Sequence, residues 1–454
     1  MSYRGKTVLV VGAARSGVAA AAFLLEQGAG VILTDTKSEA DLGAALEPLR
    51  SLVKSSGGLT LALGGHEAAN FGACDLVVVS PGVPLALPMF DESRKKGIPV
   101  IAEVELAWRH LKGRILGITG SNGKTTTTIL TAEILRGAGL KAHAAGNMGV
   151  PLISYVALST PEEWYSTELS SFQLEGIRDF RPAAGAILNL TPDHMDRYRS
   201  FEDYIAAKER LFMNQRAEDF AVLNADDERT SALAGRIPSS PVLFSRRSAP
   251  SRGIFLRGGR VVSEIPGREG DLFGLEDILL KGAHNVENVL AACALALLAG
   301  AAPESLRGVI REFKGVEHRL EWVAEIDGVQ YYNDSKATNV DATVKSLEAF
   351  AGRIHLIAGG RDKGGDFSVL RPLMRERVRQ VILIGEAAGK IRQALNGFVE
   401  MSDAADMPQA VEACRRKARP GDVVLLAPAC ASFDMYQNFE HRGRVFKEVV
   451  LSIK

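Results

Sequence analysis

Short apolar runs recur along the whole chain and alternate with longer stretches of helical character. The clearest runs cover residues 7–11, 76–79, 115–119, 186–190, 354–358, 381–384 and 423–426. They lack a polar residue at every second position, so both faces of each strand should be buried. Strands of this kind alternate with helices in parallel sheets. The pattern therefore predicts an α/β protein built from doubly wound units.

Three such units fit the 454 residues of the chain, because a domain averages about 150 residues. We expect a Rossmann-like first domain over 1–103, a central α/β domain over 104–315 and a Rossmann-like third domain over 316–454. An Asp-Gly pair at 327–328, between two apolar runs, predicts a β-hairpin at the start of the third domain. The Ser, Pro, Arg and Gly clusters of 240–270 predict a loop-rich stretch inside the central domain.

The composition argues against several classes of function. Lysine plus arginine (54) balances aspartate plus glutamate (54), so we expect no nucleic-acid partner. The first residues lack the order of a signal peptide, and no apolar run approaches the about 20 residues of a membrane span. The four cysteines have no metal-ligand spacing, which favours buried, reduced thiols. We therefore expect a cytoplasmic protein without a membrane span.

A glycine-rich loop follows the run at 115–119 and leads into a helix. It consists of Gly120, Ser121, Asn122, Gly123, Lys124, Thr125 and Thr126. A loop in this position directs backbone N–H groups and a helix N-terminus at an anion. Lys124 would meet the β- and γ-phosphates of ATP, and the Thr125 hydroxyl would reach Mg²⁺. This predicts a central domain of the P-loop ATPase type, although the loop is shorter than the common G-x-x-x-x-G-K-[ST] pattern.

Acidic residues stand directly after two of the predicted strands. Glu168 follows a strand-like stretch at 164–167, and Asp193 and His194 follow the run at 186–190. Ligands of open α/β sheets bind at the carboxyl ends of the strands, and Mg²⁺ prefers oxygen ligands. Taken alone, the segment around His194 would be a solvated turn. Beside a phosphate loop, these positions predict a metal-binding or catalytic role.

Lys208 lies on the apolar face of a predicted helix. The apolar residues of this helix are Phe201, Tyr204, Ile205, Leu211 and Phe212, which recur at helical spacing. A lysine on that face should be partly buried, and desolvation disfavours its charged form. A neutral amine can react with carbon dioxide to give an anionic carbamate. The alternative is a lysine that extends its ammonium group to solvent.

Polar loops also follow the predicted strands of the third domain. They cover 317–319, 333–339, 359–366 and 428–434. Their cations and hydroxyl groups suit a carboxylate or a phosphate. Each loop alone could be a surface turn, but their common position at strand ends predicts a binding edge. In the central domain, Asn288 near the start of an Ala-rich helix is either a helix cap or a contact to an adenine edge.

Together, these segments resemble the Mur ligase family, and the resemblance covers essentially the whole chain. The segments that carry it are GSNGKTT, ELSSFQLE, NLTPDHMDRY, AAKERLF, HNVEN, EHRLE, NDSKATN and SFDMYQNFEHRG, in this order. The last two, with SSFQLE, resemble the D-glutamate-adding members of the family. The resemblance is much more specific than the phosphate loop alone.

The resemblance implies an ATP-dependent ligase of peptidoglycan precursor synthesis. ATP would activate the L-alanine carboxylate of UDP-N-acetylmuramoyl-L-alanine as an acyl phosphate, and the amine of D-glutamate would then displace the phosphate. The first domain would bind the UDP substrate, the central domain ATP and the third domain the amino acid. Catalysis of this kind is mainly positioning and charge neutralisation. We expect these small molecules to be its partners and the protein to be a monomer.

The resemblance also assigns roles to individual residues, with Lys124, Lys208 and His194 as the catalytic set. Thr125 and Glu168 would bind one Mg²⁺, and His194 with a carbamate on Lys208 would hold a second. Lys124 and the phosphate loop would hold ATP, together with Asn288, Arg319, Asp334 and Lys336. The UDP substrate would meet Ser16, Asp35, Thr36, Ser80 and Asn147. D-glutamate would meet Thr338, Lys363, Ser432 and Phe439.

The loop from Gly12 to Gly17 departs from a dinucleotide-binding fingerprint. Ala14 stands where a second glycine would let a pyrophosphate approach the backbone. This argues against NAD, although Asp35 stands about where a ribose-binding acid would. A UDP ligand is compatible with the change.

Two other functions fit parts of the sequence. Folylpolyglutamate synthase shares the ATP-binding domain and also adds glutamate, but the first domain and the segment NDSKATN argue against it. An ATP-driven switch without ligation would leave the third-domain loops without a purpose. ATP turnover that requires both an acceptor and an amino acid separates a ligase from a switch.

Overall fold

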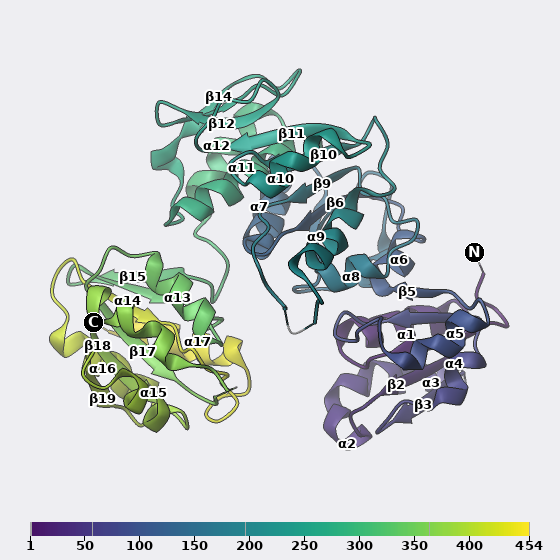
Figure 1. Cartoon of the computed structure of the whole chain (residues 1–454), viewed down its shortest axis with the longest axis horizontal. Helices are drawn as coiled ribbons and strands as arrows, with labels where there is room; N and C mark the ends of the chain where they lie inside the picture. The colour runs from purple at the N-terminus through teal and green to yellow at the C-terminus, as the bar shows by residue number, and fades with distance from the viewer. Residues whose placement is uncertain (1, 57, 196, 363, 454) are drawn as a thin grey trace. The chain divides into compact units, whose positions relative to one another are not determined.

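The computed structural model describes residues 2–56, 58–195, 197–362 and 364–453. These residues form three sheets with helices packed around them, so the expected three-domain α/β fold is confirmed (Figure 1). The chain divides into two compact units. One contains Met1–Ile278 with His284–Arg311, and the other contains Leu279–Ala283 with Glu312–Lys454.

The first sheet is parallel and has the order β3-β2-β1-β4-β5. Its strands are β1 (Thr7–Val11), β2 (Gly30–Asp35), β3 (Leu59–Leu63), β4 (Leu76–Val79) and β5 (Val100–Ala102). Its helices are α1 (Arg15–Glu26), α2 (Glu39–Leu42), α3 (Glu47–Ser56), α4 (Ala68–Gly72) and α5 (Asp91–Lys95). The strands predicted at 7–11 and 76–79 are confirmed. The strand order reverses between β1 and β4, which is where ligands bind in open α/β sheets.

The central sheet has the order β14-β13-β12-β11-β10-β9-β6-β8-β7. Its strands are β6 (Arg114–Thr119), β7 (Ala142–Gly146), β8 (Trp164–Glu168), β9 (Ala184–Ile187), β10 (Phe220–Asn224), β11 (Ser240–Ser245), β12 (Gly253–Arg257), β13 (Arg260–Ser263) and β14 (Gly270–Gly274). Its helices are α6 (Glu103–Trp108), α7 (Lys124–Gly137), α8 (Ser171–Glu175), α9 (Phe201–Glu209), α10 (Glu228–Ser231), α11 (Ala283–Leu298) and α12 (Pro303–Glu312).

Two predictions for the central domain are wrong in detail. Residues 240–270 are not a loop-rich stretch: they contain β11, β12 and β13 and lead into β14. Glycines at the tight β12–β13 turn and polar side chains at the sheet edge produced a loop-like composition. The strand predicted at 186–190 ends at Ile187. The residues after it leave the sheet and hold the phosphate loop, as described below.

The third sheet has the order β15-β16-β20-β17-β18-β19. Its strands are β15 (Glu321–Ile326), β16 (Val329–Asn333), β17 (Ile354–Gly359), β18 (Val378–Ile384), β19 (Glu400–Asp403) and β20 (Val423–Leu426). Its helices are α13 (Val340–Glu348), α14 (Arg371–Arg377), α15 (Ala388–Leu395), α16 (Met407–Lys417) and α17 (Phe439–Leu451). The predicted hairpin is confirmed, because β15 and β16 pair antiparallel and Asp327 and Gly328 have φ angles of 52° and 73°.

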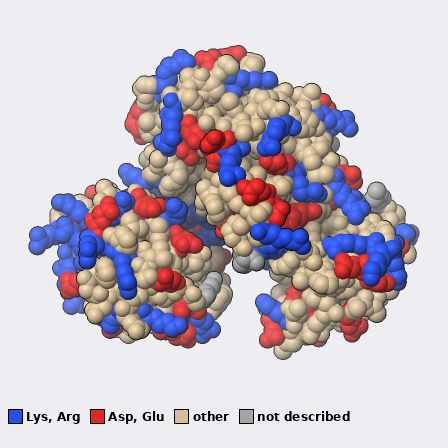
Figure 2. Space-filling model, in the orientation of Figure 1, with Lys and Arg blue, Asp and Glu red and all other residues tan. Residues whose placement is uncertain are grey.

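Charged residues of both signs are interspersed over the surface shown in Figure 2, as the balanced composition suggests. Within the part of the chain that the structure describes, no helix is long and apolar enough to cross a membrane.

Helix α6 joins the first sheet to the central domain through two buried glutamates. The Glu105 carboxylate accepts hydrogen bonds from the backbone N–H groups of Arg178, Asp179 and Phe180, and it pairs with Arg109 at 2.8 Å. Glu103 Oε1 accepts a 2.8 Å hydrogen bond from the Ile153 N–H. Glu103 Oε2 is buried and has no hydrogen-bond partner among the described residues. Burial raises the pKa of Glu103 to about 7.

Glu103 should make the stability of the protein depend on pH. Its pKa in the folded protein (about 7) lies above the ordinary value of 4.5, so between these values the folded state holds a proton that the unfolded state has lost. The free energy of unfolding should therefore fall as pH rises through this window, by up to about 3 kcal/mol. Chemical denaturation should show a flatter pH profile for Glu103→Gln. Exposed Glu26→Gln is the control, and an unchanged profile for Glu103→Gln contradicts the assignment.

Candidate functional site

The phosphate loop lies between β6 and α7 in the centre of the second sheet. Gly120 and Gly123 have φ angles of 149° and 86°, and Gly123 is the N-cap of α7. Lys124 is the first residue of that helix, and Thr125 and Thr126 are buried in its first turn. The predicted strand–loop–helix context is confirmed. A left-handed glycine at the cap turns backbone N–H groups toward one point, which suits a phosphate.

The segment after β9 holds the phosphate loop in place. The Ser121 hydroxyl donates to the Thr191 carbonyl at 2.7 Å and lies 3.0 Å from the Tyr204 hydroxyl. The Asn189 side chain accepts from the Asn122 N–H at 2.8 Å and donates to the Asn122 carbonyl at 3.2 Å. The contacts of Asn189 and Tyr204 with the phosphate loop could not be predicted from the sequence. Tyr204 stood out only as an apolar position on a helix.

Two lysines converge on one carbonyl oxygen of this loop. The Lys124 Nζ donates to the carbonyl oxygens of Gly120 and Ser121, each at 2.9 Å. The Lys208 Nζ donates to the same Gly120 oxygen at 2.9 Å and to the Thr119 hydroxyl at 3.3 Å. The amines of both lysines therefore lie where a phosphate loop would receive an anion.

Lys208 is buried on the inner face of α9, as its helical position predicts. Lys208 is 2% exposed, and its Nζ lies 4.6 Å from the centroid of the Tyr204 ring. Burial, reinforced by the charge of Lys124, holds the pKa of Lys208 well below its usual range. The alternative in which the ammonium extends to solvent is wrong. A low pKa increases the neutral amine fraction, which is the form that reacts with carbon dioxide.

Glu168 presents a carboxylate oxygen that the described protein groups leave unused. It is 2% exposed at the end of β8, and its Oε1 accepts a 3.1 Å hydrogen bond from the Asn147 amide. Its Oε2 is buried without a hydrogen-bond partner among the described residues. A buried, unpartnered carboxylate oxygen is costly unless a cation binds it. The described residues contain no converging group of three or more His, Cys, Asp or Glu side chains, so hydroxyl groups, water or a modified lysine would have to complete a metal site.

His194 lies in a turn that is held by an aromatic residue of α8. Its backbone is left-handed, with φ 55°, and its side chain is half-exposed. The Phe172 ring lies 4.9 Å from the His194 ring, and the Arg197 guanidinium carbon lies 3.5 Å from the Phe172 centroid. Phe172 therefore fixes the His194 turn against the helix that follows Glu168. The sequence analysis did not identify this role.

Asn288 contacts the phosphate loop and is not a helix cap. Helix α11 begins at Ala283, so Asn288 stands in its second turn, and its amide donates to the Asn285 side chain at 3.0 Å. A Cβ atom at Gly123 would lie 2.1 Å from the Asn288 Oδ1. Only glycine therefore fits at the cap of α7 beside this side chain.

In the first domain, two of the predicted residues organise the loop after β1. The Asp35 carboxylate accepts the Ala13 N–H at 2.7 Å, and the buried Ser80 hydroxyl donates to the Gly12 carbonyl at 2.9 Å. A Cβ atom at Gly17 would lie 1.7 Å from the same Gly12 oxygen. The loop is thus tightly packed at the point where the strand order reverses. Ser16, the second residue of α1, and Thr36, directly after β2, stay predictions as ligand contacts.

In the third domain, polar residues gather at the carboxyl ends of β16 and β20. Asp334 is buried and accepts from the Ser346 hydroxyl at 2.5 Å, and burial raises its pKa to about 6. The Lys336 Nζ lies 4.8 Å from the Phe439 ring centroid. Ser432 is buried in the loop after β20. The structure thus brings two of the predicted residues, Lys336 and Phe439, together.

Arg442 connects these loops, and the sequence analysis missed it. This fully buried guanidinium donates to the carbonyl oxygens of Ser335 (2.9 Å) and Cys430 (3.1 Å). It stands in SFDMYQNFEHRG, one of the segments that carry the family resemblance, which is the signal that could have revealed it. Arg319 has a buried Nε without a hydrogen-bond partner among the described residues.

Lys363 lies outside the described residues. The Thr338 N–H donates to the Lys336 carbonyl at 2.7 Å, which holds the loop before α13.

Three family models match successive parts of the chain. They are the MurD-like N-terminal domain of Mur ligases (residues 6–102), the Mur ligase middle domain (118–296) and the Mur ligase glutamate ligase domain (318–430). A protein of Koribacter versatilis (strain Ellin345) is 51% identical over 99% of this chain and 98% of its own length. A protein of Acidobacterium capsulatum is 50% identical over 100% and 97%. Both carry the name UDP-N-acetylmuramoylalanine–D-glutamate ligase.

Solved structures show the same fold at low sequence identity. The UDP-N-acetylmuramate-alanine ligase of Thermotoga maritima aligns with a TM-score of 0.60 at 20% identity, over 99% of this chain and 100% of that one. A pseudomurein peptide ligase type C of Methanothermus fervidus aligns with a TM-score of 0.57 at 18% identity, over 99% and 100%.

Gly123→Ala should impair the phosphate loop more than its backbone angle alone explains. The new Cβ would clash with Asn288, whereas a Cβ at exposed Gly139 would meet nothing within 4 Å at a similar φ of 79°. Gly139→Ala should cost about 1 kcal/mol of stability and Gly123→Ala about 2 kcal/mol or more. Binding of a nucleoside triphosphate, measured by calorimetry, should weaken about tenfold or more in Gly123→Ala only. Equal effects of the two substitutions contradict a role for the Asn288 contact.

Proposed function

The chain belongs to the Mur ligase family, and we propose that it joins D-glutamate to UDP-N-acetylmuramoyl-L-alanine and converts ATP to ADP and phosphate. The observation that carries the proposal is the full-length identity of about one half with relatives of that name. The phosphate loop after β6, Glu168 at the end of β8 and Lys208 of α9, whose Nζ donates to the Gly120 carbonyl, supply the matching chemistry. The product would be a peptidoglycan precursor, and we place the protein in the cytoplasm as a monomer.

The reaction proceeds in two displacements. The L-alanine carboxylate attacks the γ-phosphorus of ATP, the bond to the β–γ bridging oxygen breaks, and ADP leaves. The D-glutamate amine then attacks the acyl carbon, the bond from that carbon to the oxygen bridging carbon and phosphorus breaks, inorganic phosphate leaves with the bridging oxygen, and the amine gives up a proton as the amide forms. Both steps bring anions together, so the enzyme acts mainly by positioning and by neutralising negative charge.

Lys124 and the N-terminus of α7 supply fixed positive charge for the ATP phosphates. Thr125 and Glu168 would hold one Mg²⁺, for which the unpartnered Glu168 Oε2 is suited. His194 and a carbamate on Lys208 would hold a second ion. When bound, these ions would neutralise the phosphate and carboxylate oxygens.

The remaining roles rest on the family resemblance. Within proposed domains of 1–103, 104–315 and 316–454, the first binds the UDP substrate and the third binds D-glutamate. The UDP substrate contacts are Ser16, Asp35, Thr36, Ser80 and Asn147. The ATP contacts beyond the phosphate loop are Asn288, Arg319, Asp334 and Lys336. The D-glutamate contacts are Thr338, Lys363, Ser432 and Phe439.

Phosphate release should depend on both acceptor and amino acid. With ATP, Mg²⁺ and UDP-N-acetylmuramoyl-L-alanine, we expect release with D-glutamate but not with L-glutamate, L-lysine or meso-diaminopimelate. Release with a different amino acid would keep the ligase class and overturn the D-glutamate pocket. Release without the nucleotide sugar would instead favour the folate ligase or the switch.

Lys208→Ala should lower turnover about 100-fold or more, because it removes the anionic ligand that a carbamate would supply. Acetate, a short carboxylic acid, should restore at least part of the activity by taking the carbamate's place. Lys208→Arg is the control, because its guanidinium occupies the space and forms no carbamate, so acetate should not restore it. If acetate restores neither variant, the carbamate role is rejected.

A further inference from the structure

A cavity of about 600 Å³ is lined by residues of the first and central domains, and none of its lining residues is assigned to the ligase reaction. One side is formed by the segment that leads into β5, with Leu85, Ile98 and Val100. The other side is formed by Glu175 and the residues just after α8, and by Arg210. All of these residues belong to one compact unit. A cavity of this size accommodates a small organic molecule.

The cavity carries more positive than negative charge. Its lining contains Arg94, Arg178 and Arg210 but one acidic residue, Glu175. Arg94 is paired with Asp91 at 2.8 Å. Arg210 donates to the carbonyl oxygens of Leu174 and Ile177, each at 2.7 Å. Carbonyl oxygens orient the Arg210 guanidinium but do not neutralise it.

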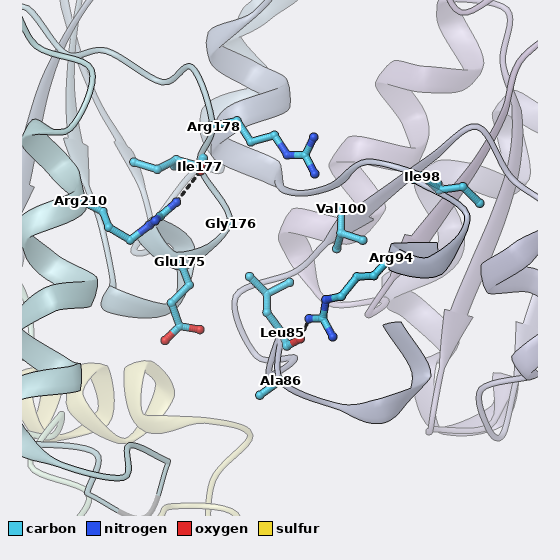
Figure 3. Close-up of a pocket in the computed structure, with 11 residues that line it drawn as sticks. Leu85, Ala86, Arg94, Ile98, Val100, Glu175, Gly176, Ile177, Arg178 and Arg210 are labelled. Atoms are coloured by element: carbon cyan, nitrogen blue, oxygen red, sulfur yellow. Dashed lines mark hydrogen bonds between the residues drawn. The ribbon is translucent and has the colours of Figure 1, made fainter. Parts of the chain in front are cut away.

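Arg178 is the guanidinium available to a ligand. Its backbone N–H is bonded to Glu105, but its exposed side chain has no hydrogen-bond or ion-pair partner among the described residues. Figure 3 shows Arg178 and Arg94 extending into the space between the two segments, with Val100 and Leu85 beside them. A free arginine fork matches a carboxylate or a phosphate.

We propose that this cavity binds a small organic acid with an apolar ring or chain. The acid group pairs with Arg178 in the field of Arg210, and the apolar part packs on the half-buried side chains of Leu85, Ile98 and Val100. A carboxylate and a phosphate monoester share this chemistry. The cavity shares no lining residue with the proposed substrate contacts, so this binding function goes beyond the ligase reaction.

The backbone connects the walls of the cavity to the proposed ligase site. The Ala102 N–H of β5 donates to the Gly176 carbonyl at 2.9 Å, which links the two walls. Helix α8, which ends beside the cavity, begins three residues after Glu168. A ligand that contacts both walls is therefore placed to act as an effector of the central domain.

The test is calorimetric titration of the full chain with 1-naphthyl phosphate, 1-naphthoate and neutral 1-naphthol. ADP, Mg²⁺ and UDP-N-acetylmuramoyl-L-alanine are kept saturating, so that the other anion sites are occupied. At least one of the two acids should bind, and 1-naphthol should bind about tenfold more weakly or worse. The tighter of the two acids identifies the preferred head group. No turnover is needed, so the result is independent of the ligase assay.

Variants locate the binding. Arg178→Ala should weaken binding about tenfold or more, whereas exposed Arg247→Ala, far along the chain on a loop after β11, should not. Ala86→Trp fills the cavity from its exposed rim and should abolish binding at an unchanged melting temperature. The proposal is overturned if neither acid binds the wild-type protein below about 10 mM, if Arg178→Ala binds as the wild type does, or if inorganic phosphate competes as well as the naphthyl acids.

Discussion

The carbonyl oxygen of Gly120 is the point on which the central site depends. Two ammonium groups, those of Lys124 and Lys208, lie 2.9 Å from it. A single neutral oxygen cannot offset two cations, and burial removes water from one of them. Burial and the charge of Lys124 lower the pKa of Lys208, which reduces the positive charge on its amine. The carboxylates of Asp193 and Glu168 act on Lys208 in the opposite direction. Anionic phosphates, or a carbamate on Lys208 itself, would add negative charge beside the two lysines, so this site suits the anionic substrates of the proposed reaction.

Hydrogen bonds of one type hold loops that follow strands in all three sheets. In each case a hydrogen bond from a buried polar side chain joins the loop to a segment that is distant in sequence. Ser80 bonds to Gly12 in the first domain, and Ser121 bonds to Thr191 in the second. Arg442 bonds to Ser335 and Cys430 in the third. Loops at strand ends are thus fixed by tertiary hydrogen bonds, which is what preorganised binding of small anions requires.

Features with a local cause could be predicted from the sequence. The apolar runs at 7–11, 76–79 and 423–426 coincide with β1, β4 and β20 because strand burial is encoded residue by residue. The Asp-Gly hairpin and the phosphate loop depend on glycine angles, and the burial of Lys208 depends on helical periodicity. Features that depend on distant partners escaped prediction. Asn189, Phe172 and Arg442 acquire their roles only when separate segments meet. The edge strands β12 to β14 carry the glycines and charges of surface loops, so composition alone misplaced them.

The order of strands in the sheets has a consequence for synthesis on the ribosome. All strands of the first sheet have been synthesised once the ribosome has passed Ala102. Strand β6, in the middle of the central sheet, has no strand to pair with until β8 and β9 have been synthesised. Helix α1 packs on residues 152–158 of the central domain, so the nascent first domain exposes an apolar surface while those residues are still being made. Chaperones or slow translation across this interval would therefore matter more for the yield of folded protein than events late in the chain.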